Sequence, residues 1–301
     1  MAKSFSDVLE LAKLRGPKKL SVAVAADEEV LCAVKEAKAL NIADAILIGD
    51  KEKIETIAKS IGMDLSQFEI IDEKDNEKAC REAVRLVSSG SADIVMKGLI
   101  DIAVIMKQVL DAEIGLRTGK IISHVGVFEI PTYHKVLLVT DAAMNITPDL
   151  AQKKEILENA VQFAHSMNIK NPKVAVLCAR EKVTTKMEAT VDAKELQDMN
   201  MRGEITGCIV GGPLALDNAI SEEAANHKGI DNPVAGDADI VLVPNIEAGN
   251  IFYKSLIFLA NAETAGLIVG TRAPIVLTSR ADSKETKLNS IALGVLMVSK
   301  N

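Results

Sequence analysis

Short runs of β-branched and aliphatic residues alternate with amphipathic stretches along most of this chain. The N-terminal third holds four such pairs, a strand candidate followed by a helix candidate each time: 20–25 with 28–40, 45–48 with 51–61, 69–71 with 76–88, and 94–96 with 102–110. Strand–helix units in series fold into a parallel sheet with helices on its faces. The pattern therefore predicts an α/β protein.

The alternation is interrupted at residues 121–140, where two strand-like runs, 121–129 and 135–140, flank a short segment that contains Pro131. This arrangement predicts a hairpin or two strands joined by a short loop. The alternation then resumes to the end of the chain. Since a chain of 301 residues fits roughly two domains, we place the domain boundary near this break.

Composition excludes several classes of protein. The chain has 35 Lys and Arg against 42 Asp and Glu, a net charge of −7 and a pI of about 5.3. This acidic balance argues against a nucleic-acid-binding protein, as does an aromatic content of 3% without Trp. No window approaches the roughly 18 apolar residues of a membrane span, and the first residues lack a secretory apolar region. We therefore expect a cytoplasmic protein with no membrane partner.

Cysteine and histidine spacing gives no sign of a metal site. The four cysteines are far apart, without a C-x-x-C pair, and the four histidines show no ligand spacing. We expect four reduced structural thiols and no bound metal.

The most informative segment follows the strand expected at 275–277. Thr278, Ser279 and Arg280 would lie at the carboxyl end of a parallel strand and just before a helix, where α/β proteins bind ligands. The helix N-terminus, two hydroxyls and one guanidinium suit an anion such as phosphate. Asp282 has a second interpretation as the helix N-cap, with Glu285 as its capping-box partner.

Four further strand-to-helix turns carry polar residues or glycines and are weaker candidates: Lys97-Gly98, Asp141 to Asn145, Gly211-Gly212-Pro213 and Glu247 to Asn250. Lys97 could equally be a solvated turn lysine. Thr147 and Pro148 fit the N-cap and first position of a helix, which leaves Asp141 and Asn145 available to a ligand.

Several common motifs are absent. The chain has no G-x-x-x-x-G-K-[ST], which excludes a P-loop. It has no G-x-G-x-x-G, which weakens a nicotinamide-dependent dehydrogenase, and no G-x-S-x-G, so Ser279 is not an α/β-hydrolase nucleophile.

Together these segments resemble the phosphate acetyl/butyryltransferase family, over nearly the whole chain and in order. The matching runs are Val95-Met-Lys-Gly98, Thr140-Asp-Ala-Ala-Met-Asn145, Gly211 to Ala219, Asn245 to Asn250 and Leu277-Thr-Ser-Arg-Ala-Asp-Ser283. The Gly211 to Ala219 run and the Ser279 to Ser283 run look like the butyryl branch.

The resemblance implies an isocitrate/isopropylmalate-dehydrogenase-like fold, with two three-layer α/β/α domains and the active site in the cleft between them. Domain one would be residues 1–133 plus 273–301, and domain two residues 134–272. The implied reaction is reversible: butyryl-CoA plus phosphate gives butyryl phosphate plus CoA. Coenzyme A would be a substrate and no cofactor would be needed. We expect a homodimer or higher homo-oligomer.

The resemblance also implies roles for single residues. Ser279 would stabilise the transition state and Arg280 would bind phosphate. The family's base, an Asp seven residues after the serine, is replaced here by Thr286, so Glu285, Asp282 or Asp141 would have to serve. Lys107 stands in place of a family arginine, and Lys97 or Arg117 would share its role. The catalytic candidates are thus Ser279, Arg280, Glu285 and Asp141, and the substrate-binding candidates are Thr278, Lys97, Gly98, Asn145, Lys107, Gly211, Gly212 and Asn250.

The chemistry expected is direct transfer in a ternary complex. A covalent acyl-Ser279 intermediate stays open as an alternative, although no histidine is evidently placed to activate Ser279. Three alternatives stay open: a phosphate acetyltransferase, a metal-dependent dehydrogenase on the same fold, and a non-catalytic two-domain protein that binds acyl-CoA or phosphate. The dehydrogenase lacks evident clustered Asp ligands and a nicotinamide site.

Overall fold

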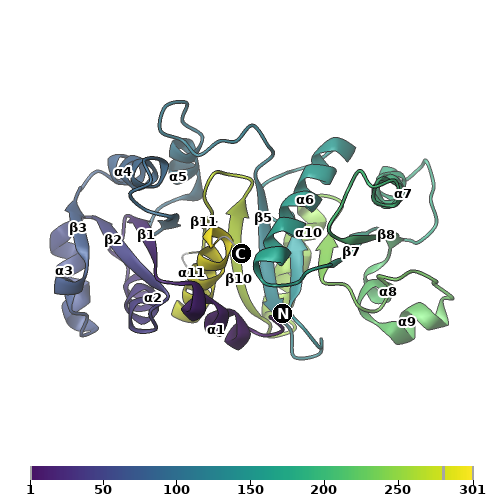
Figure 1. Cartoon of the computed structure of the whole chain (residues 1–301), viewed down its shortest axis with the longest axis horizontal. Helices are drawn as coiled ribbons and strands as arrows, with labels where there is room; N and C mark the ends of the chain where they lie inside the picture. The colour runs from purple at the N-terminus through teal and green to yellow at the C-terminus, as the bar shows by residue number, and fades with distance from the viewer. Residues whose placement is uncertain (1, 280–281, 300–301) are drawn as a thin grey trace. The chain divides into compact units, whose positions relative to one another are not determined.

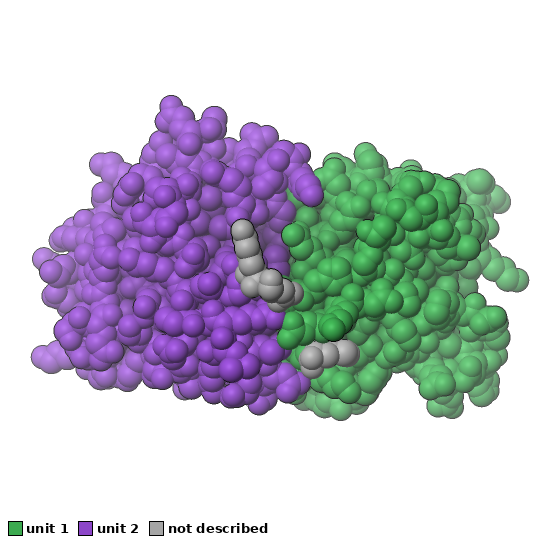
Figure 2. Space-filling model, in the orientation of Figure 1, with its two compact units in different colours: residues 1–5, 121–264 green, residues 6–120, 265–301 purple. Residues whose placement is uncertain are grey.

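The computed structural model describes residues 2–279 and 282–299. The chain forms two compact units, which Figure 2 colours separately: unit 1 is residues 1–5 and 121–264, and unit 2 is residues 6–120 and 265–301. The sequence analysis placed its boundaries at 133/134 and 272/273. Those two domain boundaries stay a prediction.

Unit 2 contains a mainly parallel sheet with the strand order β3-β2-β1-β4-β11-β10 (Figure 1). Its strands are β1 (Lys18–Ala23), β2 (Ala43–Gly49), β3 (Glu69–Asp72), β4 (Ile94–Lys97), β10 (Glu263–Val269) and β11 (Ile275–Val276). Strand β10 pairs antiparallel with β11, and the pairings of β1 with β2 and β4, of β2 with β3 and of β11 with β4 are parallel. The C-terminal strand β11 joins this sheet beside β4, the fourth strand of the N-terminal segment.

Two groups of helices cover this sheet: α2 packs against α11, and α4 packs against α5 (Figure 1). The helices of unit 2 are α1 (Phe5–Arg15), α2 (Glu28–Ala39), α3 (Lys51–Ser60), the 3-10 turn η1 (Leu65–Gln67), α4 (Asn76–Ser88), α5 (Ile102–Val109) and α11 (Lys284–Val298). Aspartates Asp27, Asp50 and Asp75 begin α2, α3 and α4, because each carboxylate accepts a hydrogen bond from the first turn.

Unit 1 has the strand order β5-β6-β9-β7-β8. Its strands are β5 (Ser123–Glu129), β6 (Leu137–Thr140), β7 (Lys173–Leu177), β8 (Ile209–Leu214) and β9 (Ile240–Leu242). β5 and β6 form the antiparallel pair expected at 121–140, and the remaining neighbours are parallel. Its helices are α6 (Leu150–Ser166), α7 (Glu188–Met201), α8 (Leu216–Ile220), α9 (Glu222–His227) and α10 (Ile246–Phe258).

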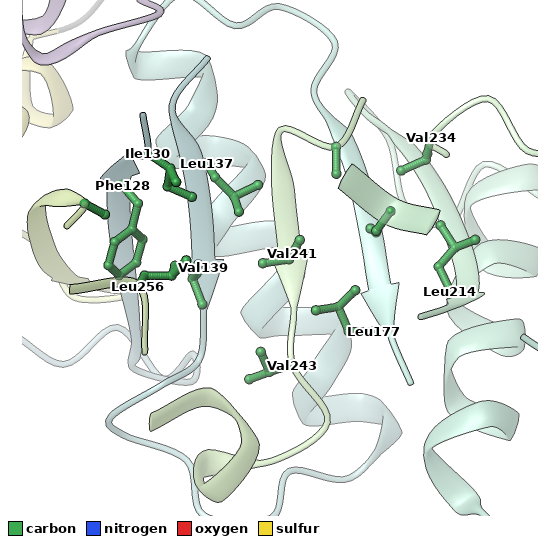
Figure 3. Packing of buried hydrophobic residues seen from close by; sticks show 14 residues of the cluster. Phe128, Ile130, Leu137, Val139, Leu177, Leu214, Val234, Val241, Val243 and Leu256 are labelled. Atoms are coloured by element: carbon green, nitrogen blue, oxygen red, sulfur yellow. The ribbon is translucent and has the colours of Figure 1, made fainter. Parts of the chain in front are cut away.

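A cluster of apolar side chains fills one side of this sheet (Figure 3). Phe128, Leu137, Val139 and Val241 from β5, β6 and β9 are fully buried in it. Burial of side chains of this size stabilises the fold by about 1.5–3 kcal/mol each, so the cluster stabilises the sheet of unit 1.

Three expectations about element boundaries were wrong. Helix α6 begins at Asp149, which forms a capping box with Gln152, rather than at Thr147 and Pro148. The apolar pattern of residues 214–225 predicts one helix, but the structure has two short helices there, α8 and α9, with Ser221 between them as the N-cap of the second. Helix α10 begins after Asn245, so the expected turn at 247–250 lies inside a helix.

Candidate functional site

In unit 2, the candidates from β4 and β11 lie at one edge of the sheet. These two strands are parallel neighbours, with Val95 opposite Ile275 and Met96 opposite Val276. Lys97, the last residue of β4, and Thr278, just after β11, therefore emerge side by side at the carboxyl ends of the strands. This is the edge at which open α/β sheets bind ligands.

Thr278 is 4% exposed, and its hydroxyl is buried without a hydrogen-bond partner among the residues that the structure describes. Buried hydroxyls without partners are rare, because leaving one unpaired costs about 1–3 kcal/mol. Ser279, the next residue, is exposed. The pair thus presents an accessible hydroxyl beside a buried one that needs a partner.

The loop after Ser279 is closed by main-chain and side-chain hydrogen bonds. Asp282 donates its backbone N–H to the Ser279 carbonyl at 3.2 Å, and its carboxylate accepts from the Ser279 N–H at 2.6 Å. Asp282 is therefore not the N-cap of α11 as expected. Ser283 caps the helix by accepting from the Thr286 N–H, and Asp282 instead holds the backbone of Ser279. Arg280, the other main candidate, lies outside the described residues.

Lys287, on α11, contacts this loop and was not among the residues selected from the sequence. It lies in the first turns of α11, is 2% exposed, and its ammonium contacts the carbonyl oxygens of Ser279, at 3.4 Å, and of Asp282. It precedes Leu288 and is four residues before Ile291, and all three belong to the continuously buried part of the helix from Lys287 to Leu296. That spacing from Ile291 is the signal that could have placed Lys287 inside the fold.

Lys97 is also buried, at 3% exposure, and its ammonium donates to the carbonyl oxygens of Gly98 at 3.1 Å and Ile100 at 3.0 Å. Gly98 has a structural reason to be glycine, because a Cβ there would lie 2.1 Å from the carbonyl oxygen of Val24. Val24 has a φ of 53°, a left-handed conformation that is unusual for a β-branched residue. Lys97 is therefore held by backbone rather than solvated in a turn.

Lys107 has a different environment from Lys97. It lies on α5, and its ammonium pairs with the carboxylate of Glu77 on α4, with most of the lysine side chain exposed. Glu77 and Lys107 also line a mixed-charge hollow between these helices, together with Arg81 and Asp111. Among residues 2–279 and 282–299, Lys107 makes no hydrogen bond or ion pair with the loops that follow β4 and β11.

In unit 1, Asp141 organises the loop that follows β6. Its buried carboxylate accepts from the backbone N–H groups of Ala143, Met144 and Asn145 at 2.9–3.2 Å and from the Asn145 side chain at 2.6 Å. The Asn145 amide also donates to the carbonyl of Ile122. Four donors occupy the Asp141 carboxylate, so its evident task is to shape the loop.

Asn250 lies beside this loop, with its amide 3.4 Å from the carbonyl oxygen of Ala142. Gly249 allows the approach, since a Cβ there would lie 2.9 Å from the Asp141 carbonyl oxygen and from the Ala142 Cα. Asp141, Asn145 and Asn250 are thus brought together at the carboxyl ends of β6 and β9, which are parallel neighbours.

His124 is a second residue that the sequence analysis did not select. It is 7% exposed on β5, its Nδ1 is buried without a partner among the described residues, and its ring packs 5.7 Å from that of Tyr253. Burial lowers the pKa of His124, while the charge of Asp141 acts to raise it. The imidazole is therefore neutral at pH 7.

Gly211 and Gly212 lie within strand β8, not in the strand-to-helix turn expected for them. A Cβ on Gly211 would lie 2.4 Å from Asn232 Oδ1, and one on Gly212 would lie 3.0 Å from Val176 Cβ. Close packing inside unit 1 accounts for both glycines.

Glu285 is exposed on the first turn of α11. Hydrogen bonds from its own backbone N–H and from the Ser283 hydroxyl hold the pKa of its carboxyl below the usual value. The carboxylate is therefore ionised at neutral pH but is a weak proton acceptor.

Within residues 2–279 and 282–299, no group of three or more His, Cys, Asp or Glu side chains is arranged to hold a metal ion. No helix in that part of the chain has the length and apolar character of a membrane span.

Comparison with known proteins gives the family. The model of the phosphate acetyl/butaryl transferase family matches residues 4–84 and 76–295. The phosphate butyryltransferase of Clostridium beijerinckii is 54% identical over all of both chains. The phosphate acetyltransferase of Thermotoga maritima is 47% identical over 96% of this chain and 98% of its own. The chain belongs to the phosphate acetyl/butaryl transferase family.

A solved structure supports the fold independently. The branched-chain phosphotransacylase from Enterococcus faecalis superposes with a TM-score of 0.84 at 37% identity, over 94% of this chain and 100% of that chain. This match confirms the predicted fold class, a mixed α/β fold that phosphotransacylases share.

Proposed function

We propose that this chain catalyses the reversible exchange of a butyryl group between coenzyme A and inorganic phosphate. Membership of the family makes the chain an acyltransferase. The observation that carries the butyryl assignment is the full-length identity of 54% to a phosphate butyryltransferase. The geometry of the present chain is compatible with binding of phosphate. Lys97, Thr278 and Ser279 offer a cation and two hydroxyls at the edge of the parallel sheet where α/β proteins bind ligands.

The proposed chemistry is a direct transfer in a ternary complex. A phosphate oxygen attacks the thioester carbonyl carbon, the new C–O bond forms, and the C–S bond breaks as the electron pair leaves on the CoA sulfur. A thiol with a pKa near 8.5 is a good leaving group, so no strong acid is needed. Catalysis then depends on holding phosphate and on stabilising the oxyanion.

We assign Arg280 to phosphate binding and Ser279 to donation of a hydrogen bond to the oxyanion. Thr278, Lys97 and Gly98 would bind substrate at the same edge. The position of Ser279 is supported by the hydrogen bonds that hold its backbone to Asp282.

Asp141 and Asn145 are proposed as further substrate-binding residues, as is Asn250, whose amide lies 3.4 Å from the Ala142 carbonyl oxygen in their loop. Lys107, Gly211 and Gly212 stay in the proposal as weaker binding residues, because the structure gives each of them a packing or pairing role instead.

In the CoA-acylating direction the thiol must lose a proton. We propose Glu285 as the acceptor, because its carboxylate is exposed and lies on the helix turn that follows the Ser279 loop. The Asp141 carboxylate is the second candidate, although its four hydrogen-bond donors leave it less available.

Coenzyme A enters this proposal as a substrate, with no further cofactor. A cytoplasmic location is supported by four cysteines without disulfide partners, the usual state in a reducing compartment. We also propose a homodimer or higher homo-oligomer.

Exchange of an acetyl group is the second candidate, because an acetyltransferase is 47% identical to this chain. Thiol release from acetyl-, propionyl-, butyryl- and valeryl-CoA, measured with and without phosphate, separates the two. We expect the highest kcat/KM with butyryl-CoA. A preference for acetyl-CoA would replace the butyryl assignment, and no phosphate-dependent release from any of the four would refute the proposal.

A further inference from the structure

Lys287 is buried, and its ammonium group has no negative partner among the residues that the structure describes. Its hydrogen-bond partners are two main-chain carbonyl oxygens, those of Ser279 and Asp282. No described carboxylate lies within 4.0 Å of it, whereas Lys284, on the first turn of the same helix, pairs with Glu285 at 3.6 Å. An ammonium has three donors, so one of them is left without an acceptor among the described residues.

The acidic side chains nearest to Lys287 in the sequence, those of Asp282 and Glu285, bind other partners. The Asp282 carboxylate accepts from the Ser279 N–H at 2.6 Å, and Glu285 pairs with Lys284 at 3.6 Å. Carbonyl dipoles offset only part of the cost of burying a full charge, and buried charges in proteins are normally paired. The Lys287 ammonium therefore has no direct counter-ion among the described residues.

A second observation at the same loop also indicates a missing partner. The buried hydroxyl of Thr278, the residue before Ser279, makes no hydrogen bond to any described residue. A cation without a counter-ion and a hydroxyl without an acceptor both lie where the chain leaves β11. An oxyanion would satisfy both, since it brings negative charge and several acceptor oxygens.

We propose that Lys287 is a positioning residue for phosphate: its ammonium holds the Ser279 and Asp282 carbonyls in place, and its buried charge is compensated when phosphate binds at this loop. The inference rests on the proposed function for the identity of the anion. Its charge argument requires only that inorganic phosphate binds.

The test compares Lys287→Met with the unaltered protein and with Lys284→Met. Methionine has nearly the length of lysine and removes the charge from the buried position. Lys284 lies three residues earlier on the same helix, is half exposed, and contributes no contact to the loop. It is therefore the matched control for loss of one positive charge from α11. Lys287→Arg and Lys287→Gln are the second variants if Lys287→Met does not fold.

Two readouts are measured. The first is the rise in melting temperature on adding inorganic phosphate, against sodium chloride of equal ionic strength, because a ligand stabilises the state that binds it. The second is the change in KM for phosphate compared with the change in KM for butyryl-CoA. We expect Lys287→Met to lose most of the phosphate-dependent rise. Its KM for phosphate should increase about 10- to 100-fold, as for a lost interaction with a charged group, with KM for butyryl-CoA within about twofold.

Lys284→Met should match the unaltered protein in its phosphate-dependent rise in melting temperature and in its two KM values. Lys287→Arg should retain more phosphate stabilisation than Lys287→Gln. Equal phosphate stabilisation in Lys287→Met and in the unaltered protein would overturn the inference. So would a rise of both KM values together, which is what a purely structural lysine predicts. If the unaltered protein binds phosphate but exchanges no acyl group, the proposed function fails while the melting experiment still decides the role of Lys287.

Discussion

The carboxylate of Asp282 accepts a hydrogen bond of 2.6 Å from the backbone N–H of Ser279. The bond spans three residues and closes the loop that carries the proposed oxyanion donor. Asp282 therefore acts on Ser279 directly, whereas the capping of α11 is left to Ser283.

Replacement of Asp282 by alanine is expected to lower kcat about 10- to 100-fold, because a displaced catalytic group loses its alignment with the reacting atoms. Asp282→Asn keeps a side-chain acceptor for the Ser279 N–H and should retain most of the activity. Steady-state rates and melting temperatures of both variants test this. Equal rates for the alanine and asparagine variants would show that the bond does not position Ser279.

Glu285→Gln examines the proposed proton acceptor. The low pKa of Glu285 makes it a weak base, so we expect a decrease of about 10- to 100-fold in acyl-CoA formation, at the lower end for general base catalysis. The glutamine keeps the size of the side chain, so the free energy of unfolding should barely change. Full activity in the CoA-acylating direction would exclude Glu285 as the base and leave Asp141 to be tested.

Arg280→Ala is expected to lower kcat/KM for phosphate by roughly 10- to 100-fold, through a higher KM, a lower kcat or both. The substitution removes a charge-assisted contact with a substrate anion. Arg202, which pairs with Glu195 and Glu204 on the surface of α7, provides the control variant Arg202→Ala. Initial rates at varied phosphate measure the effect. Near-normal phosphate kinetics in Arg280→Ala would remove this arginine from the site.

Gly211→Ala separates packing from substrate binding. The new Cβ would lie 2.4 Å from Asn232 Oδ1 and 2.9 Å from Val234 Cβ, so we expect a loss of about 1–3 kcal/mol in the free energy of unfolding. Urea denaturation measures that loss, and KM values of the folded fraction should be unchanged. Unaltered stability with a raised KM for butyryl-CoA would restore Gly211 to the binding site.

Because His124 is buried in its neutral form, the protein is expected to lose stability on mild acidification. Its pKa is lowered in the folded state by burial, so the unfolded chain binds the proton first. The stability that the neutral imidazole contributes is fully present above the unfolded pKa of about 6.5 and declines as the pH falls below it. Denaturation between pH 7.5 and 5 should show this decline, and His124→Gln should reduce it. An identical pH dependence in the variant would contradict the burial argument.

Hydrophobic alternation predicted the elements of the fold because each buried strand is a short apolar run between helices. It also predicted that Lys97 and Thr278 end two strands, although not that those strands are neighbours. Side-chain identity at helix starts was less informative. Asp282 and Ser283 are adjacent and both are good N-caps, so only the observed geometry separates their roles.

The remaining differences come from contacts between residues that are distant in the sequence. Lys107 pairs with Glu77, 30 positions away, and no local pattern distinguishes that lysine from a ligand-binding one. Gly211 and Gly212 resemble a turn because glycine and proline commonly form turns. Here Asn232 and Val176 leave no room for a side chain, a constraint that no local spacing contains.

Lys97 and Lys287 anchor their loops through main-chain carbonyl oxygens, those of Gly98 and Ile100 in one case and of Ser279 and Asp282 in the other. Every amino acid carries such an oxygen, so these anchors do not depend on which side chains the loops present. Substitutions in the loops can therefore alter substrate preference over evolutionary time while the backbone conformation is retained. Substitution of Lys97 or Lys287 itself would remove these contacts, so the loop conformations depend on these two side chains.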